Sequence, residues 1–203
     1  MIAFLFYNAD LLDIAEYDNE STLAFVDDSL VAVEGNNFKD TTSDLSFFMN
    51  RDDGGFDWSK KHNSRFEIDK LAVMHCTNQR LRDPDNPRTS IPLPRPELKL
   101  QGRVIEEVEN YKYLGVMVDS KLRWGVQGKR AAAKAINWIL LFRRLTQVST
   151  GMSAKLMRRL YLGVAIPKIT YGADIWFTPL RLEIGKTRRR GSVAMLWELE
   201  KVQ

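Results

Sequence analysis

Two adjacent aspartates, Asp27 and Asp28, interrupt an apolar run over residues 22–34. Each flank of the pair is short and rich in β-branched and aromatic residues, which is typical of a buried strand. Two carboxylates between two such strands repel each other, and a bound divalent cation would neutralise both, because hard cations prefer oxygen ligands. The pair therefore predicts either the exposed turn of a hairpin or a metal site.

The residues around the pair bear on this choice. Aspartate is common in turns, so a hairpin needs no function to explain it. Two-residue hairpin turns, however, favour Asn-Gly or Asp-Gly, in which glycine supplies the positive φ angle. Here Ser29 and then four apolar residues follow the pair. The lack of a glycine favours a functional pair of carboxylates and leaves the ordinary turn as the alternative.

Charge is distributed unevenly along the 203 residues. Residues 1–120 carry 13 basic and 22 acidic side chains, for a net charge of −9, whereas residues 121–190 carry 16 basic and two acidic ones, for +14. A basic excess of this size indicates contact with nucleic acid or another polyanion. The alternatives are a solubilising surface and a basic face that pairs with the acidic half.

The composition excludes several classes of protein. A single cysteine, Cys76, cannot form an intramolecular disulfide and is typical of a reducing compartment. Cys76, His62 and His75 together supply too few ligands for a typical structural zinc site. No segment has the roughly 20 apolar residues that span a bilayer, and the apolar N-terminus lacks the basic region of a signal peptide. We expect an intracellular protein of the cytoplasm or nucleus, not secreted and with no membrane partner.

Helices and strands are mixed in the first half of the chain. Residues 41–50 have the spacing of an amphipathic helix, which Thr41 or Thr42 can cap. Five of the seven prolines fall within 83–96, which predicts a solvated, extended linker. Residues 113–118 are apolar enough for a strand. These elements predict an α+β fold.

Two basic helices are predicted in the second half. The clearer one covers residues 127–146, where an apolar stripe recurs at three- and four-residue steps and the basic side chains lie off it. We interpret this stripe as core and not as a platform for stacking bases; it comprises Ala131, Ala135, Trp138, Phe142 and Leu145. Ser153 caps the second helix, over about 154–166, and Pro167 stops it. Its inward side chains are expected to be Leu156, Leu160 and Val164.

Five stretches of the sequence occur in a particular order along the chain, and together they are more specific than any one of them. They are residues 4–12, the hairpin Phe25-Val26-Asp27-Asp28, residues 62–74, residues 111–119 and the helical region 127–172. In this order they resemble the C-terminal half of the reverse transcriptase of non-LTR (LINE-like) retrotransposons, particularly the fungal kind. The hairpin is similar to the catalytic Tyr-x-Asp-Asp box of the palm, the next two stretches to a palm motif and the primer grip, and the helices to the thumb. The resemblance covers roughly residues 2–180.

The resemblance implies a domain organisation and a reaction. It implies a partial palm with the Asp-Asp hairpin over residues 1–82, the Pro-rich linker at 83–96, a primer-grip-like hairpin at 97–124, a basic helical thumb at 125–180 and a connector at 181–203 toward a missing RNase H domain. Reverse transcriptases are RNA-directed DNA polymerases, and polymerases use two metal ions, Mg²⁺ or Mn²⁺, for nucleotidyl transfer. The implied partners are an RNA template, a DNA primer and deoxynucleoside triphosphates.

The resemblance also implies roles for particular residues. Asp27 would be the main metal ligand and Asp28 the weaker one. Lys70 matches a lysine near the incoming triphosphate, where it would assist the departure of pyrophosphate as an acid; an ordinary surface lysine is the alternative. The primer terminus would be held by the backbone of Leu114, Gly115 and Val116. The nucleic acid would be bound by Lys129, Arg130, Lys134, Arg143, Arg144, Lys155, Arg158 and Arg159.

One departure from the family limits what this chain can do. The family needs a third carboxylate and the fingers, both upstream of the stretches that match here, and Asp10 and Asp13 lie too close to the hairpin to supply it. We expect two metal ions only if that carboxylate is supplied, and we expect that this chain alone does not polymerise. The alternative is a non-catalytic retroelement remnant whose basic helices still bind nucleic acid. An unrelated acidic metal-binding protein would require the resemblance of the helices to be chance.

Overall fold

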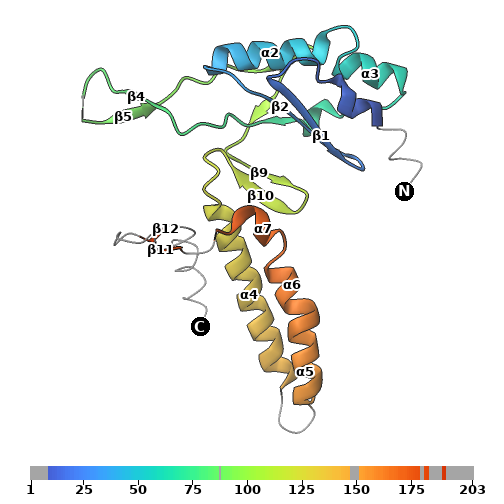
Figure 1. Cartoon of the computed structure of the whole chain (residues 1–203), viewed down its shortest axis with the longest axis vertical. Helices are drawn as coiled ribbons and strands as arrows, with labels where there is room; N and C mark the ends of the chain where they lie inside the picture. The colour runs from blue at the N-terminus through green and yellow to red at the C-terminus, as the bar shows by residue number, and fades with distance from the viewer. Residues whose placement is uncertain (1–8, 87, 147–150, 179–180, 183–188, 191–203) are drawn as a thin grey trace. The chain divides into compact units, whose positions relative to one another are not determined.

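The computed structural model describes residues 9–86, 88–146, 151–178, 181–182 and 189–190 (Figure 1). The chain divides into two compact units, residues 1–114 and residues 115–203. Small, mostly antiparallel hairpins and several helices make up the described residues, which confirms a mixed α+β fold. Within these residues, no helix combines the length and the apolar character needed to cross a membrane.

The first unit consists of a long hairpin, two helices and several short strands. The short helical turns are η1 (Ala9–Ile14) and η2 (Ile68–Lys70), and the helices are α2 (Phe38–Asn50) and α3 (Gly55–Lys61). The long hairpin pairs β1 (Glu20–Phe25) with β2 (Asp28–Val33). The short strands are β3 (Ala72–Val73), β4 (Arg80–Arg82), β5 (Ser90–Pro92), β6 (Lys99–Leu100), β7 (Arg103–Val104), β8 (Glu106–Glu107) and β9 (Asn110–Tyr113). β3 and β8 pair in parallel, while β4–β5 and β6–β7 are antiparallel.

The core of this unit lies against only one face of the long hairpin. Its buried side chains are Leu11, Ile14, Phe48, Met49, Phe56, Trp58, Val73, Leu98, Leu100 and Ile105. Ala24 and Val31 of the hairpin pack against this cluster. Because side chains alternate along a strand, Leu23 and Phe25 lie on the opposite face, where 55% and 60% of their surface is exposed. The hairpin is thus anchored on one side and open on the other.

Helix α2 begins one turn earlier than the sequence predicts. Asn37 is its N-cap, and the Asn37 side-chain oxygen accepts a hydrogen bond from the backbone N–H of Asp40 at 2.8 Å. Thr41 and Thr42 lie inside the helix, so the predicted cap is wrong. Asparagine is a strong N-cap residue because its side chain satisfies a free N–H of the first turn, and here it stands immediately before the helix.

The proline-rich segment 83–96 is not uniformly extended and solvated as expected. Its residues Ser90–Pro92 form β5 and pair with β4. Pro92 stands at the end of this isolated two-stranded ladder, a position that tolerates the missing N–H. Farther along, the Arg95 guanidinium contacts the carboxylates of Glu107 and Glu109 at 2.6 and 2.5 Å. These pairs attach the end of the segment to the β8–β9 region.

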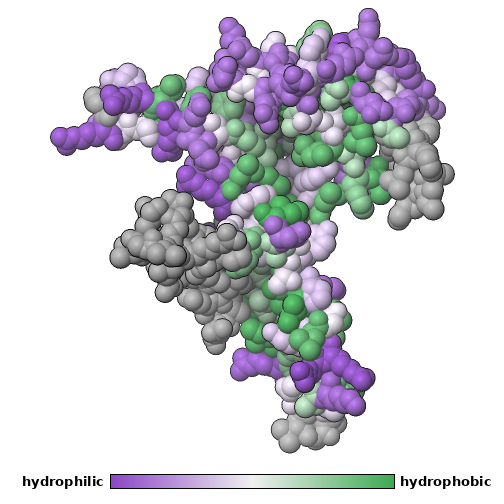
Figure 2. All heavy atoms as spheres, viewed as in Figure 1, coloured by the Kyte–Doolittle hydropathy of each residue, from purple (hydrophilic) through white to green (hydrophobic). Residues whose placement is uncertain are grey.

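The second unit is built around one long helix. Its elements are β10 (Val116–Asp119), α4 (Gly125–Leu145), α5 (Ala154–Leu160), η3 (Tyr161–Ala165), α6 (Ile166–Ile169), α7 (Ala173–Trp176), β11 (Arg181–Leu182) and β12 (Arg189–Arg190). The predicted helix over 127–146 is confirmed as α4, which begins two residues earlier. Val116, Ala131 and Trp176 form the buried cluster of this unit. Figure 2 shows that apolar side chains also reach the surface of these helices.

The second predicted helix continues through its proline. Ser153 stands at the predicted N-cap position, but its side chain makes no capping hydrogen bond. Residues 161–165 form a π-helical turn, and the backbone N–H of Ile166 donates to the carbonyl of Tyr161. Pro167 follows in the first turn of α6 and does not stop the helix. A proline lacks the backbone N–H that an α-helix requires. A π-turn widens the helix locally and changes which carbonyls accept hydrogen bonds, so the helix can continue through the proline. The inward placement of Leu156 is also wrong, since half of its surface is exposed.

Candidate functional site

The Asp pair lies at the tip of the β1–β2 hairpin. Phe25 pairs with Asp28, so Val26 and Asp27 form a two-residue turn. Both aspartates are exposed. Val26 has a φ of +59°, in the left-handed region that costs an L-residue about 1–2 kcal/mol. The turn predicted as one alternative is therefore present, and it directs two carboxylates to solvent from a strained backbone.

A buried ion pair fixes the base of the same hairpin. Arg51 contacts both carboxylate oxygens of Glu20, at 2.7 Å from Nη1 and 2.9 Å from Nη2, and Nη2 also donates to the Ile14 carbonyl at 2.6 Å. The two side chains are only 6% and 3% exposed. The guanidinium lies 5.3 Å from the ring centre of Tyr17 and 5.1 Å from that of Phe48. This cluster ties β1 to η1 and to the end of α2.

Opposing effects act on the pKa of Glu20. Burial raises the pKa of this carboxyl, but hydrogen bonds from Arg51 and from the backbone of Glu16, together with the charge of Arg51, lower it further than burial raises it. The net pKa is below the ordinary glutamate value. The hydrogen bond to Glu20 in turn raises the pKa of Arg51. The pair is thus ionised under ordinary conditions. Both terminal nitrogens of Arg51 donate hydrogen bonds in this buried position, whereas its Nε has no hydrogen-bond partner among the described residues.

The charge of Asp28 acts on Tyr113, the last residue of β9. Burial raises the pKa of the Tyr113 phenol, and the negative charge of Asp28 raises it further. Both residues belong to the first unit. The end of β9 therefore lies near one carboxylate of the hairpin tip, although 85 residues of sequence separate Asp28 from Tyr113.

Lys70 is an exposed lysine with a local partner. Its ammonium lies 2.5 Å from a carboxylate oxygen of Glu67, three residues earlier, and 76% of the Lys70 side chain is exposed. The hydrogen bond to Glu67 raises the pKa of Lys70. Lys70 therefore stays protonated, which a proton donor requires and which a surface lysine also shows. Its predicted role at the triphosphate stays a prediction.

The primer-grip-like segment contains a tight turn in place of the predicted continuous strand over 113–118. β9 ends at Tyr113 and β10 begins at Val116, and the two form a two-stranded sheet. Leu114 and Gly115 have φ angles of +46° and +86°, which is the pattern of a type I′ turn. Positive φ at both residues reverses the chain within two positions, so an apolar run that looks like one strand becomes two.

Side chains of the second unit support β10 from this turn onward. Val116 is buried, and the backbone N–H of Met117 donates to the side-chain oxygen of Gln127 at 3.0 Å. Gln127 itself is 1% exposed and belongs to the first turn of α4. A Cβ atom built on Gly115 would lie 3.1 Å from Cε1 of Tyr171, so the turn packs closely against that ring.

The basic residues predicted to bind nucleic acid lie along α4 and α5. Arg130 and Lys134 are half-buried, and the other six are exposed: Lys129, Arg143, Arg144, Lys155, Arg158 and Arg159. The apolar stripe of α4 behaves unevenly. Ala131 is buried as predicted, whereas Trp138 is half-buried and lines an open groove. The interpretation of the stripe as core is therefore confirmed in full only for Ala131, since Ala135, Trp138, Phe142 and Leu145 are half-buried.

The carboxylates of the described residues do not assemble a complete metal site. In that part of the chain, no three His, Cys, Asp or Glu side chains lie close enough together to hold one ion. Asp27 and Asp28 are oxygen donors of the kind that Mg²⁺ and Mn²⁺ prefer, and their exposure leaves room for further ligands. The pair fits part of a divalent-cation site.

Comparison with known proteins bears on the identity of the chain. It is 24% identical over 183 residues to the RNA-directed DNA polymerase from the mobile element jockey of Drosophila melanogaster, which covers 86% of this chain. It is 27% identical over 81 residues, or 40% of this chain, to the retrovirus-related Pol polyprotein from the type-1 retrotransposable element R1 4 of Nasonia vitripennis. The chain is similar to non-LTR retrotransposon reverse transcriptases. The matches span 18% and 21% of these two proteins. No family model and no solved structure matches this chain.

Within the described residues, sequence reasoning missed three features. Glu20 lies in a short polar stretch that predicts the end of the preceding element, and its partner Arg51 is 31 residues away. The proximity of Tyr113 to Asp28 likewise depends on the tertiary fold. The groove beside Trp138 had a sequence signal, since Lys134 stands one helical turn before this aromatic residue on α4, but the same pattern is typical of a core-facing helix.

Proposed function

We propose that this chain is a palm and thumb portion of an RNA-directed DNA polymerase, in which Asp27 and Asp28 supply two of the carboxylates for the catalytic metal ions. One observation carries the proposal: the hairpin tip presents both carboxylates to solvent from a strained turn. It is supported by the similarity of 86% of the chain to the jockey polymerase. Strained residues that the surrounding structure holds in place cluster at functional sites.

The residues of the site divide the work. Asp27, at the turn, and Asp28, at the first position of β2, would hold Mg²⁺ through their oxygens. When bound, two such ions align the attacking 3′-hydroxyl and neutralise charge on the transferring phosphoryl group. The Glu20–Arg51 pair fixes the base of β1 and so limits the movement of the tip. The turn at Leu114 and Gly115 would position the end of the primer strand through backbone groups.

The metal-binding step is tested with Mn²⁺, whose unpaired electrons broaden nearby amide signals in NMR spectra. We expect low Mn²⁺ concentrations to broaden the amides of Val26 to Ser29, and Asp27→Asn to abolish this broadening. Asp52→Asn is the matched control, because Asp52 and Asp53 form a second exposed, adjacent pair outside the hairpin. Tip signals that ignore Mn²⁺, or that broaden equally in Asp27→Asn, would contradict the proposal.

The incomplete carboxylate set predicts the behaviour of this chain in a primer-extension assay. With an RNA template, a DNA primer, deoxynucleoside triphosphates and Mg²⁺, we expect no templated extension, because two carboxylates hold a pair of ions poorly. Extension that Asp27→Ala abolishes would show that the chain itself completes the site.

The basic helices are proposed to hold the template and primer. Residues 121–190 carry a net charge of +14, and neutralised phosphates release counterions, so affinity falls steeply with salt. We expect the full chain to bind an RNA–DNA duplex weakly, with a negative slope of log affinity against log salt. Replacing Arg158 and Arg159 by Gln should reduce that slope by about 2. Affinity that does not depend on salt, or no binding at low salt, would leave the basic face with a solubilising role only.

A further inference from the structure

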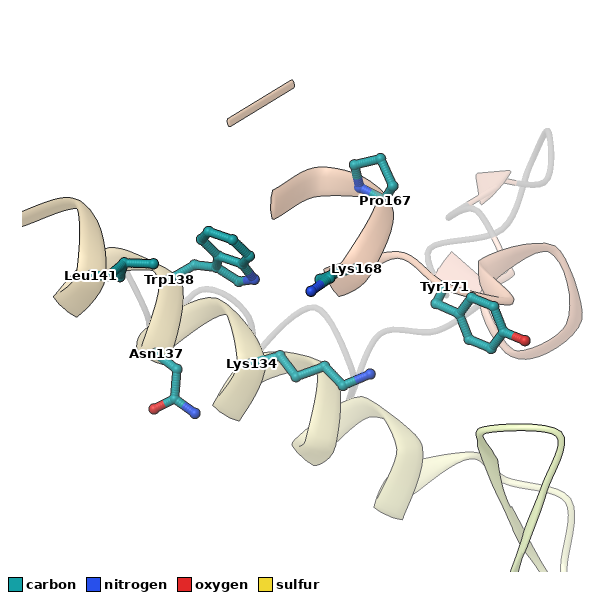
Figure 3. Close-up of a pocket in the computed structure, with 7 residues that line it drawn as sticks. All are labelled: Lys134, Asn137, Trp138, Leu141, Pro167, Lys168 and Tyr171. Carbon is teal, nitrogen blue, oxygen red and sulfur yellow. The ribbon is translucent and has the colours of Figure 1, made fainter. Parts of the chain in front are cut away.

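An open groove in the second unit lies between α4 and the segment that contains α6. Its volume is about 680 Å³. On one side it is lined by Lys134, Asn137, Trp138 and Leu141, and on the other by Pro167, Lys168 and Tyr171. Figure 3 shows the Trp138 ring between the two helices, with the Lys168 side chain near it and Tyr171 at the far end, while Asn137 points away. A volume of this size is within the range of pockets that hold small organic ligands.

The lining combines flat aromatic surface with cations. The Lys168 ammonium lies 6.0 Å from the centre of the Trp138 ring. Tyr171 is 52% exposed. Lys134 lies on α4 one helical turn before Trp138. The seven lining residues include no carboxylate. A nucleotide would use both the aromatic faces and the lysines, because its base stacks on the rings and its phosphates attract the ammonium groups. An apolar peptide would use the aromatic faces alone, so the lining matches a nucleotide better.

The groove adjoins the turn that is proposed to hold the primer. Tyr171 lines the groove and also packs on Gly115, at 3.1 Å from the position of a Cβ atom there. The carbonyl of Tyr171 accepts a hydrogen bond from the indole N–H of Trp176 at 2.9 Å, and Trp176 is buried. The backbone of Tyr171 is therefore anchored in the core of the unit, so one fixed residue connects the groove with the turn.

We propose that this groove binds an unpaired nucleotide of a nucleic acid strand, with the base stacked on Trp138 and Tyr171 and the adjacent phosphates near Lys134 and Lys168. The proposal rests on the proposed function for the source of the strand, a template or primer. It goes beyond that function because it assigns single-stranded binding to a defined site, apart from the duplex contacts of the outer basic residues. In a duplex the bases are already stacked on each other, so the groove should discriminate between the two forms.

The test measures the affinity of the full chain for a labelled oligothymidylate and for an RNA–DNA duplex of the same length. Trp138→Leu should lower the affinity for the single strand about tenfold, since one base–aromatic contact is lost. The affinity for the duplex should change little. Trp138→Phe should restore most of the single-strand affinity and also controls for folding, because it keeps an aromatic ring next to Phe142, whose ring centre lies 5.7 Å from that of Trp138.

A second pair of variants tests the phosphate contact. Lys168→Gln and Lys155→Gln each remove one exposed positive charge, but only Lys168 lines the groove. Lys168→Gln should reduce the salt slope for the single strand by about 1, and more than Lys155→Gln does. Equal slopes for the two variants, or an equal loss of single-strand and duplex affinity in Trp138→Leu, would overturn the proposal.

The outcome is separable from that of the proposed polymerase function. The two sites have separate readouts, because no residue of the hairpin tip lines the groove: Mn²⁺ broadening reports on the tip, and oligothymidylate affinity reports on the groove. If Trp138→Leu weakens binding of the single strand but not of the duplex, and Mn²⁺ does not broaden the tip signals, the groove proposal is supported and the polymerase site is rejected. If Mn²⁺ binds at the tip but Trp138→Leu weakens single-strand and duplex binding equally, only the groove proposal is rejected.

Discussion

Two hairpins of the first unit reverse direction by different means. In β6–β7 the turn residues Gln101 and Gly102 have φ angles of +49° and +76°, so glycine occupies the second left-handed position. In β1–β2 only Val26 is left-handed, and the second turn residue is Asp27. A β-branched residue is among the least suited to a positive φ angle. The hairpin with the carboxylate pair therefore has the less favourable turn.

The difference agrees with the role proposed for the carboxylate pair. The Gln101–Gly102 turn needs only to reverse the chain, and glycine makes that reversal easy. Under the proposed function the Val26–Asp27 turn also presents a carboxylate at its tip, and Asp27 occupies the place that glycine has in the other turn. Strain of this kind persists only where the surrounding structure compensates for it. The buried Glu20–Arg51 pair, at the opposite end of the same hairpin, is a candidate for that compensation.

The largest expected effect comes from removing this anchor. Arg51→Ala leaves the buried Glu20 carboxylate without its partner, and breaking a buried pair in this way costs about 3–5 kcal/mol of unfolding free energy. Urea unfolding of the full chain measures it. Arg103→Ala is the matched control, since Arg103 pairs with Asp69 at 2.6 Å but both side chains are mostly exposed, and exposed pairs contribute little. Equal losses in the two variants would remove the special role of the hairpin base.

The same pair predicts a dependence of stability on pH. Because the folded-state pKa of Glu20 is lowered, its contribution is fully present above the glutamate pKa of the unfolded chain. The contribution is lost as the pH falls through the lower, folded-state pKa. Glu20→Gln should flatten the decline of unfolding free energy in this acidic window. An unchanged acidic limb in Glu20→Gln would show that other carboxyls cause it.

A smaller effect separates backbone strain from side-chain contact at the glycine turns. Gly102→Ala should cost about 1 kcal/mol through its positive φ alone, because a Cβ atom there meets nothing within 4 Å. Gly115→Ala should cost about 2 kcal/mol, because its Cβ atom would also press on Tyr171. Unfolding followed through amide signals of the unit that holds each glycine gives both values. Equal costs would mean that the Tyr171 ring moves aside freely.

Sequence periodicity was sufficient for α4 and for the hairpin, but not for the contacts that join them to other parts of the fold. The stripe containing Ala131 repeats at helical spacing within one element, so it is visible locally. The Glu20–Arg51 pair joins residues 31 positions apart, and no local pattern marks it. Pro167 was expected to end a helix because a proline lacks an N–H. The π-turn before it resolves that problem through backbone geometry that residue preferences do not reveal.

The candidate site follows the same division. Asp27 and Asp28 could be predicted because two carboxylates in an apolar run are chemically unusual, and their position at a turn was one of the two alternatives. That Val26 takes the left-handed conformation could not be predicted from valine, which disfavours it. The preference of the residue and the demand of the turn conflict here, and such conflicts are expected at functional sites.

A last substitution, with an expected effect no larger than that of Gly102→Ala, tests this conflict directly. Val26→Gly relieves the left-handed strain, and we expect the unfolding free energy to rise by about 1 kcal/mol after the greater freedom of glycine in the unfolded chain is included. The relieved turn also fixes Asp27 less firmly, so broadening of the tip amides should require a higher Mn²⁺ concentration than in the original chain. A more stable protein with weaker metal binding would show that the strained valine orders the carboxylate. A more stable protein with unchanged binding would reduce the Val26 conformation to a cost without a function, and the two hairpins would then differ only in stability.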